Sequence, residues 1–119
     1  MALHATLTGR TTQARDPDWQ PLLDFAPECI DDFMWMFEVE TECGLRLQAY
    51  KHRWTRGYLH LSHDGRAFVY VEDGRDGDDA LYREVDPLRL LTVVLEPRPG
   101  REPEWAIPPR ARRRKRARA

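Results

Sequence analysis

The sequence predicts an α+β domain: a five-stranded antiparallel meander, as an open sheet or a small barrel, with a short N-terminal helical segment, a C-terminal capping helix and a disordered basic tail. Three observations lead to this prediction. Residues 32–73 contain four short runs in which side chains alternate as they do in strands. Glycine-containing turns at 42–44 and 63–65 divide these runs into two hairpins. Asp86-Pro87 then opens an apolar helix.

The N-terminal part is the least regular. Residues 1–15 have no convincing period and are expected to form a flexible arm, or at most a poorly paired edge strand. A single α+β domain is expected over residues 16–96. It begins with a short helix capped by Asp18, and Pro27 ends this helix and opens a second turn that runs to Asp32. The inward face of the first helix is predicted to contain Trp19, Leu22, Leu23 and Ala26.

The first hairpin joins Phe33 to Glu40 with Leu45 to His52. Gly44 is the third residue of its turn, the position that needs a positive φ. This turn fixes a register that sets apolar residues opposite each other and a carboxylate opposite a guanidinium. The predicted pairs are Glu40 with Arg46, Glu38 with Gln48, Val39 with Leu47 and Phe37 with Ala49.

The second hairpin joins Tyr58 to Ser62 with Arg66 to Glu72 through a turn that ends in Gly65. A three-residue turn keeps like side chains on one face, whereas a two-residue Asp-Gly turn would mix the faces. The predicted pairs are His60 with Phe68, Leu61 with Ala67, Leu59 with Val69 and Tyr58 with Tyr70.

Alternation along these strands predicts two apolar faces, and a sheet that is apolar on both faces must be covered on both or use one for binding. The first face is predicted to hold Phe33, Trp35, Phe37, Val39, Leu45, Leu47, Ala49, Leu59, Leu61, Ala67, Val69 and Val71. The second is predicted to hold Met34, Met36, Tyr50, His52, Tyr58, His60, Phe68 and Tyr70.

Leu81 to Val85 is the predicted fifth strand. The helix that follows, Leu88 to Leu95 with Asp86 as its N-cap, is apolar nearly all round. It is therefore expected to be buried on more than one side and to cover part of the second face. The acidic loop 73–79 superficially resembles a calcium loop but lacks its glutamate, so a solvated loop is favoured.

Composition excludes several classes of protein. No apolar run is long enough to span a membrane, and the N-terminus lacks the basic start and apolar block of a secretory signal, so a cytoplasmic location is expected. The two cysteines, Cys29 and Cys43, indicate reduced thiols, and neither a metal nor a cofactor is predicted. Arginine outnumbers lysine seventeen to two, which favours a GC-rich, bacterial coding sequence.

The net charge of −1 hides a strong asymmetry. Residues 97–109 are predicted to be a proline-rich linker, and residues 110–119 a basic, disordered tail. Such a tail attracts any dense polyanion, whereas residues 1–109 carry twelve basic and twenty acidic residues. The basic residues of the tail are Arg110, Arg112, Arg113, Arg114, Lys115, Arg116 and Arg118.

Two further groups of residues are candidates for function. The connection between the second and third strands interleaves cations with an aromatic ring, a pattern that can grip phosphates and stack bases, although a bend with its tryptophan over the sheet edge is favoured. Its candidate binding residues are Lys51, Arg53, Trp54 and Arg56. His52 and His60 both fall on the second face, where they could serve acid–base chemistry, although structural histidines are favoured.

These features predict a small, non-enzymatic binding module whose basic tail contacts nucleic acid or an acidic surface. A first alternative is a small hydrolase or transferase that uses His52 and His60 in a pocket on the second face. A second alternative is an accessory protein that assembles through the sheet edge without nucleic acid. Another protein is also a candidate partner, through the sheet edge or the second face. The sequence does not predict an oligomeric state.

Overall fold

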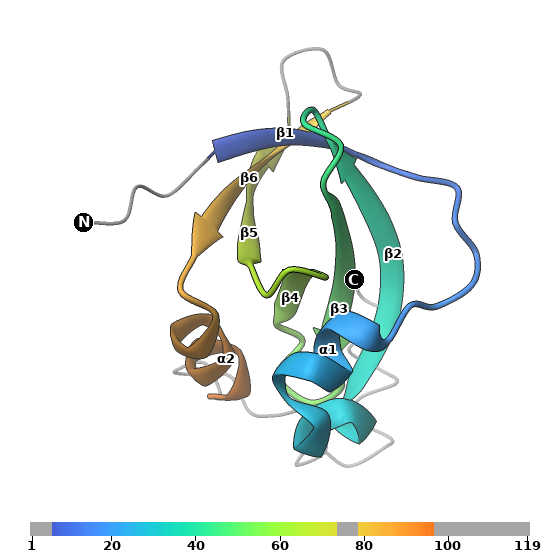
Figure 1. The fold of residues 1–119 in the computed structure, drawn as a ribbon. Coiled ribbons are helices and arrows are strands. Elements are labelled where there is room, and N and C mark those ends of the chain that lie inside the picture. The colour runs from blue at the N-terminus through green and yellow to red at the C-terminus, as the bar shows by residue number, and fades with distance from the viewer. Residues whose placement is uncertain (1–5, 74–78, 97–119) are drawn as a thin grey trace, which may run out of the picture.

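The structure, a computed structural model, describes residues 6–73 and 79–96 (Figure 1). The predictions for the linker, for the basic tail and for most of the acidic loop lie outside the described residues. The elements in chain order are β1 (Thr6–Thr11), α1 (Gln20–Phe25), η1 (Pro27–Asp32, a 3₁₀ helix), β2 (Phe33–Thr41), β3 (Arg46–His52), β4 (Tyr58–Ser62), β5 (Ala67–Asp73), β6 (Ala80–Val85) and α2 (Pro87–Leu95). None of the helices in these ranges is long and apolar enough to cross a membrane.

The strands form a closed, antiparallel barrel in the order β1-β2-β3-β4-β5-β6. Antiparallel strands with short helices agree with the predicted class, but the prediction of five strands was wrong. The sixth is β1, which lies in the predicted flexible arm, pairs with β2 and β6, and crosses the top of the barrel in Figure 1. Gly9 allows this closure, because a Cβ atom there would lie 2.6 Å from Val39 Cγ1.

Both hairpin turns have the predicted geometry. Gly44 and Gly65 have φ values of 84° and 88°, which favour glycine. All four predicted pairs of the first hairpin are present, and so are two pairs of the second, His60 with Phe68 and Leu61 with Ala67. The other two predicted pairs of the second hairpin are absent from the β4–β5 ladder, which contains only these two pairs.

The predicted faces were wrong, because the register between β3 and β4 joins them differently. Ala49 lies opposite His60, and Tyr50 lies opposite Leu59. Since residues directly opposite each other point to the same side, His60 shares its side with Ala49, and Leu59 shares its side with Tyr50. A bulge between Trp35 and Phe37 also moves the first part of β2 to the other side.

The barrel therefore has two cores. Its interior is filled by Val39, Leu47, Phe68 and Tyr82. Outside the barrel, α1 and α2 cover the face of β4 that carries Leu59 and Leu61 (Figure 1). This outer core contains Leu22, Ala26, Phe33, Tyr50, Leu59, Leu61, Ala67, Leu90 and Val94.

The cap of α2 was predicted correctly, but that of α1 was not. The N-cap of α1 is Trp19 rather than Asp18 and makes no side-chain capping bond, although Asp18 accepts a hydrogen bond from the backbone N–H of Gln20 at 3.1 Å. The side chain of Asp86 accepts a hydrogen bond from the backbone N–H of Arg89 at 2.9 Å, as a capping residue does. The helix α2 packs on Leu59, which was assigned to the first face, and it also lies beside Tyr58 and His60 of the predicted second face. It is buried on one side only, contrary to the prediction. Leu88 and Val93 are 68% and 63% exposed. In α1, Leu22 is buried as predicted, whereas Leu23 is exposed.

Candidate functional site

A cavity of about 710 Å³ lies where β4 and β5 separate. The two strands are paired only next to their turn. Farther from the turn, Tyr58 on β4 and Tyr70 on β5 are not paired with each other, and both line the cavity. Phe37, His60 and Tyr82 line it from the inside of the barrel. A cavity of this volume is in the range that holds a small ligand.

The third wall of the cavity is α2, which contributes Leu90, Val93 and Val94. The turn before β4 holds the end of this helix in place. The hydroxyl of Thr55 donates to the carbonyl oxygen of Val94 at 2.5 Å, and a Cβ atom at Gly57 would lie 3.2 Å from Val94 Cγ1. Leu90 and Val94 therefore pack in the outer core and also border the cavity.

His60 is the chemically distinctive group of the cavity. It is 3% exposed, and its Nδ1 atom is buried without a hydrogen-bond partner among the described residues. Burial lowers the pKa of the imidazole to about 4, so the ring is neutral at pH 7. Aromatic rings surround it: Tyr58 is stacked at 5.9 Å, Tyr82 lies at 5.1 Å and Phe37 at 6.1 Å between ring centroids.

Charged groups line the cavity beside this apolar wall. They are Arg56 from the turn before β4, Asp79 before β6, and Glu96 after α2. Asp79 accepts a hydrogen bond at 3.1 Å from the guanidinium of Arg10. Arg56 has a φ of 70°, the only positive φ of a non-glycine residue in the described ranges. A conformation of this kind costs free energy and persists only where the surrounding structure imposes it.

His52 does not belong to this site. Its Nδ1 atom accepts hydrogen bonds from the backbone N–H groups of Trp54 and Thr55, at 3.2 and 3.1 Å, and so shapes the turn after β3. Burial lowers the pKa of His52, and the carboxylate of Asp32 partly opposes this effect. The register sets His52 and His60 on opposite sides of the sheet, so the predicted pair of histidines in one pocket is not formed.

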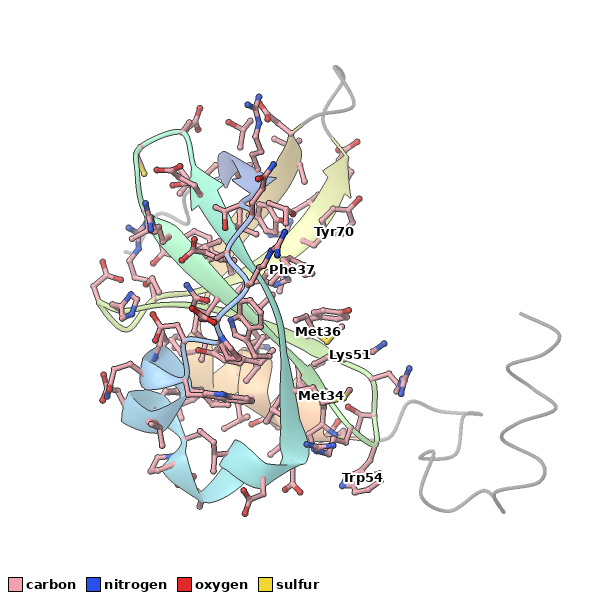
Figure 2. The ribbon with its side chains drawn as sticks, turned by 90° about the vertical axis from the view of Figure 1, so that its right-hand side faces the viewer. Met34, Met36, Phe37, Lys51, Trp54 and Tyr70 are labelled. Carbon is pink, nitrogen blue, oxygen red and sulfur yellow. The ribbon has the colours of Figure 1, made fainter. Side chains whose placement is uncertain are left out.

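The candidate binding residues at the end of β3 and in the turn after it do not form one cluster. Figure 2 shows Lys51 and Trp54 on the same side of the barrel as Phe37 and Tyr70, along with Met34 and Met36. Trp54 is 37% exposed, and Lys51 Nζ lies 5.7 Å from the centroid of the Tyr58 ring. Arg53 instead donates to the carbonyl oxygen of Asp31 at 3.0 Å. The candidate residues of the tail lie outside the described residues.

Sequence reasoning placed Phe37 in an ordinary core and gave no role to Gly9, Tyr82 or the end of α2. The signals for Gly9 and Tyr82 were weak: a glycine in the interior of a strand indicates a close approach of another group, and Tyr82 alternates with its neighbours. Nothing in a periodic pattern indicates that two strands of a hairpin separate after two pairs.

Within the described residues, no group of three histidine, cysteine, aspartate or glutamate side chains could hold a metal ion. Both Cys29 and Cys43 are free thiols. Each strand of the closed barrel has a neighbour on both sides, so no strand among the described residues has a wholly unpaired edge. The part of β5 beyond its two pairs with β4 is the stretch of edge left for the predicted assembly through a sheet edge. Comparison with known proteins gave no match to a family model, to a curated protein or to a solved structure.

Proposed function

We propose that the protein is a non-enzymatic binding module whose cavity takes up a small ligand with an apolar, ring-containing body and one polar group that bonds to His60. The observation that carries this proposal is the buried Nδ1 atom of His60 without a hydrogen-bond partner among the described residues, in a residue that lines the cavity. A buried polar atom left without a bond costs about 1–3 kcal/mol. A ligand that supplies the missing bond recovers that free energy.

The surroundings of His60 favour binding over acid–base catalysis. Burial is the cause of its lowered pKa, and among the described residues no carboxylate opposes this effect in the way that Asp32 does at His52. A general base works best with a pKa near the working pH, and a value of about 4 is far below that. The aromatic rings of Phe37, Tyr58 and Tyr82 provide contact area and exclude water, as in ligand pockets generally.

Three bicyclic probes of similar shape test this proposal: indole, which only donates a hydrogen bond, quinoline, which only accepts one, and benzothiophene, which does neither well. Because the neutral imidazole has one N–H and one bare nitrogen, its tautomer decides whether Nδ1 bonds to indole or to quinoline. We expect one of these two to bind about tenfold more tightly than benzothiophene, as measured by NMR titration.

His60→Phe should remove this preference while keeping a ring of similar size in the wall. His63→Phe is the matched control, because His63 is an exposed histidine in the turn after β4 and does not line the cavity. It should bind all three probes as the unmodified protein does. Equal affinities for all three probes in the unmodified protein, or a preference that survives in His60→Phe, would contradict the proposal.

A second candidate function is contact with nucleic acid through the basic tail, assisted by Lys51 and Trp54. The exposure of Trp54, on the same side of the barrel as Lys51 (Figure 2), favours it. Binding should be insensitive to sequence and weaken with salt, with a slope near −0.9 per neutralised phosphate of duplex DNA. Deleting residues 110–119 should remove most of this slope; if the full chain binds no DNA at low salt, this function is wrong.

A further inference from the structure

The wall of the cavity is a continuous series of aromatic rings. From one end to the other, the distances between neighbouring centroids are 6.3 Å for Phe37–Tyr58, 5.9 Å for Tyr58–His60, 5.1 Å for His60–Tyr82 and 6.0 Å for Tyr82–Tyr70. The faces of tyrosine and phenylalanine rings carry partial negative charge and attract cations. A wall of this kind therefore discriminates among ligands by charge as well as by shape.

Most of the other groups around the cavity also favour a positively charged ligand. Two carboxylates, Asp79 and Glu96, line it, and Arg56 is the only lysine or arginine that does so among the described residues. The C-terminal end of α2 also borders the cavity, and the last carbonyl groups of a helix carry partial negative charge. His60 is neutral at pH 7 and adds no opposing positive charge.

The chain itself provides an example of a cation on this wall. Lys51 Nζ lies over the ring of Tyr58, 5.7 Å from its centroid, within the distance at which ammonium groups are attracted to aromatic faces. Lys51 is opposite Tyr58 in the β3–β4 ladder and so approaches the ring from the neighbouring strand. One ring of the wall thus already has an ammonium group over it, which leaves Phe37, Tyr70 and Tyr82 as the main rings for a ligand, and Lys51 itself brings a like charge close to the wall.

We infer that the ligand of this cavity is an organic cation, an ammonium compound whose apolar body contacts the aromatic wall and whose charge is balanced by Glu96 and Asp79. This inference rests on the proposed function, since it specifies the ligand of the same cavity. Arg56 limits the affinity for such a cation, because it brings a like charge to the lining. Asp79 is partly neutralised by Arg10, which leaves Glu96 as the more effective carboxylate.

A charge series on one ring system tests the inference: tryptamine is cationic at pH 7, indole is neutral and indole-3-acetate is anionic. We expect tryptamine to bind about 3- to 30-fold more tightly than indole, which corresponds to the range of cation–π attraction, and indole-3-acetate to bind more weakly than indole. Titrations at two salt concentrations should reduce the advantage of tryptamine at the higher one.

Variants of the lining identify the source of this preference. Glu96→Gln should weaken tryptamine binding several-fold and leave indole binding unchanged. Glu28→Gln, which removes the same charge from an exposed position in η1, is the matched control and should change neither. Arg56→Gln should strengthen tryptamine binding. Arg56 already has an interaction in the structure, so thermal unfolding of this variant must be measured alongside its affinity.

The outcomes separate the two proposals. If indole or quinoline binds in a His60-dependent manner but tryptamine binds no better than indole-3-acetate, the cavity is a ligand site and the inference of a cation is wrong. Weaker tryptamine binding by a stably folded Arg56→Gln variant would also overturn it. If none of the probes binds in a way that depends on His60, the proposed function itself fails.

Discussion

The two sides of β4 differ in what fills them. Leu59 and Leu61 point to the outer core and are covered by α1 and α2, whereas Tyr58 and His60 point to the other side and line an open cavity. One short strand thus contributes both to a buried core and to the lining of a cavity. The alternation of a strand therefore determines which residues share a side, while neighbouring elements decide whether that side is packed or left open.

The largest expected effect is on the packed side. Leu59→Ala should lower the free energy of unfolding by about 2–5 kcal/mol, because Leu59 is 0% exposed and the truncation leaves a void in a close-packed core. Urea denaturation followed by tryptophan fluorescence measures this change. A loss below about 1 kcal/mol would mean that the two sides of β4 are not as different as the packing indicates.

The next largest effect is a pH dependence of stability that comes from His60, on the side of β4 that faces the cavity. His60 has a pKa near 6.5 when unfolded and about 4 when folded, so the unfolded state binds more protons between these values. The contribution of the neutral His60 ring to the free energy of unfolding is therefore fully present above pH 6.5. It is lost as the pH falls towards 4, and the loss reaches at most about 3 kcal/mol. The difference between the unmodified protein and His60→Phe, measured from pH 7 to 4, isolates it. Parallel curves would show that folding does not lower the pKa of His60.

A smaller loss of stability is expected from a change in α2, which borders both the outer core and the cavity. Asp86→Ala should cost about 1 kcal/mol through loss of the bond to the N–H of Arg89. Because fraying of α2 also opens the cavity wall, indole should bind more weakly. Asp24→Ala, at an exposed position in α1 away from the cavity, should leave indole binding unchanged. If Asp86→Ala lowers stability without affecting indole, α2 belongs functionally to the outer core alone.

The smallest effect on stability is expected for the ring that faces the cavity. Tyr58→Leu should cost less than about 1 kcal/mol, because its side chain borders open space and is only partly buried. The same change should reduce tryptamine binding more than indole binding, since it removes one aromatic face. A stability loss as large as that of Leu59→Ala would show that the cavity is in fact a well-packed core.

The local parts of the fold could be predicted because they depend on a few neighbouring residues. Gly44 and Gly65 need a positive φ, and that requirement, together with the alternation of the flanking residues, predicted the pairs of the first hairpin and the two pairs nearest the turn of the second. The assignment of faces failed because it depends on the connection from Arg53 to Gly57, whose length and shape set the register of β3 against β4. No alternation within a strand carries that information.

The cavity was beyond prediction for a similar reason. His60 and Tyr58 were recognised as members of an unusual face, but the site exists because β4 and β5 separate after two pairs and α2 packs beside the gap. Both features are tertiary. The weak pattern of Thr6–Thr11 likewise concealed β1, whose position is decided by partners distant in the sequence.

Closure of the barrel by β1 also constrains how the chain folds. Thr6, in the first of the described strands, pairs with Arg83, in the last. The hairpins of β2–β3 and β4–β5 can form as soon as they emerge, but β1 pairs on both sides only after β6 has been synthesised. Bringing such distant segments together costs entropy that grows with the intervening length, and topologies with distant pairs fold slowly. Barrel closure is therefore expected to follow the formation of the two hairpins, and until it occurs the edge of β2 that receives β1 is open to pairing with other chains.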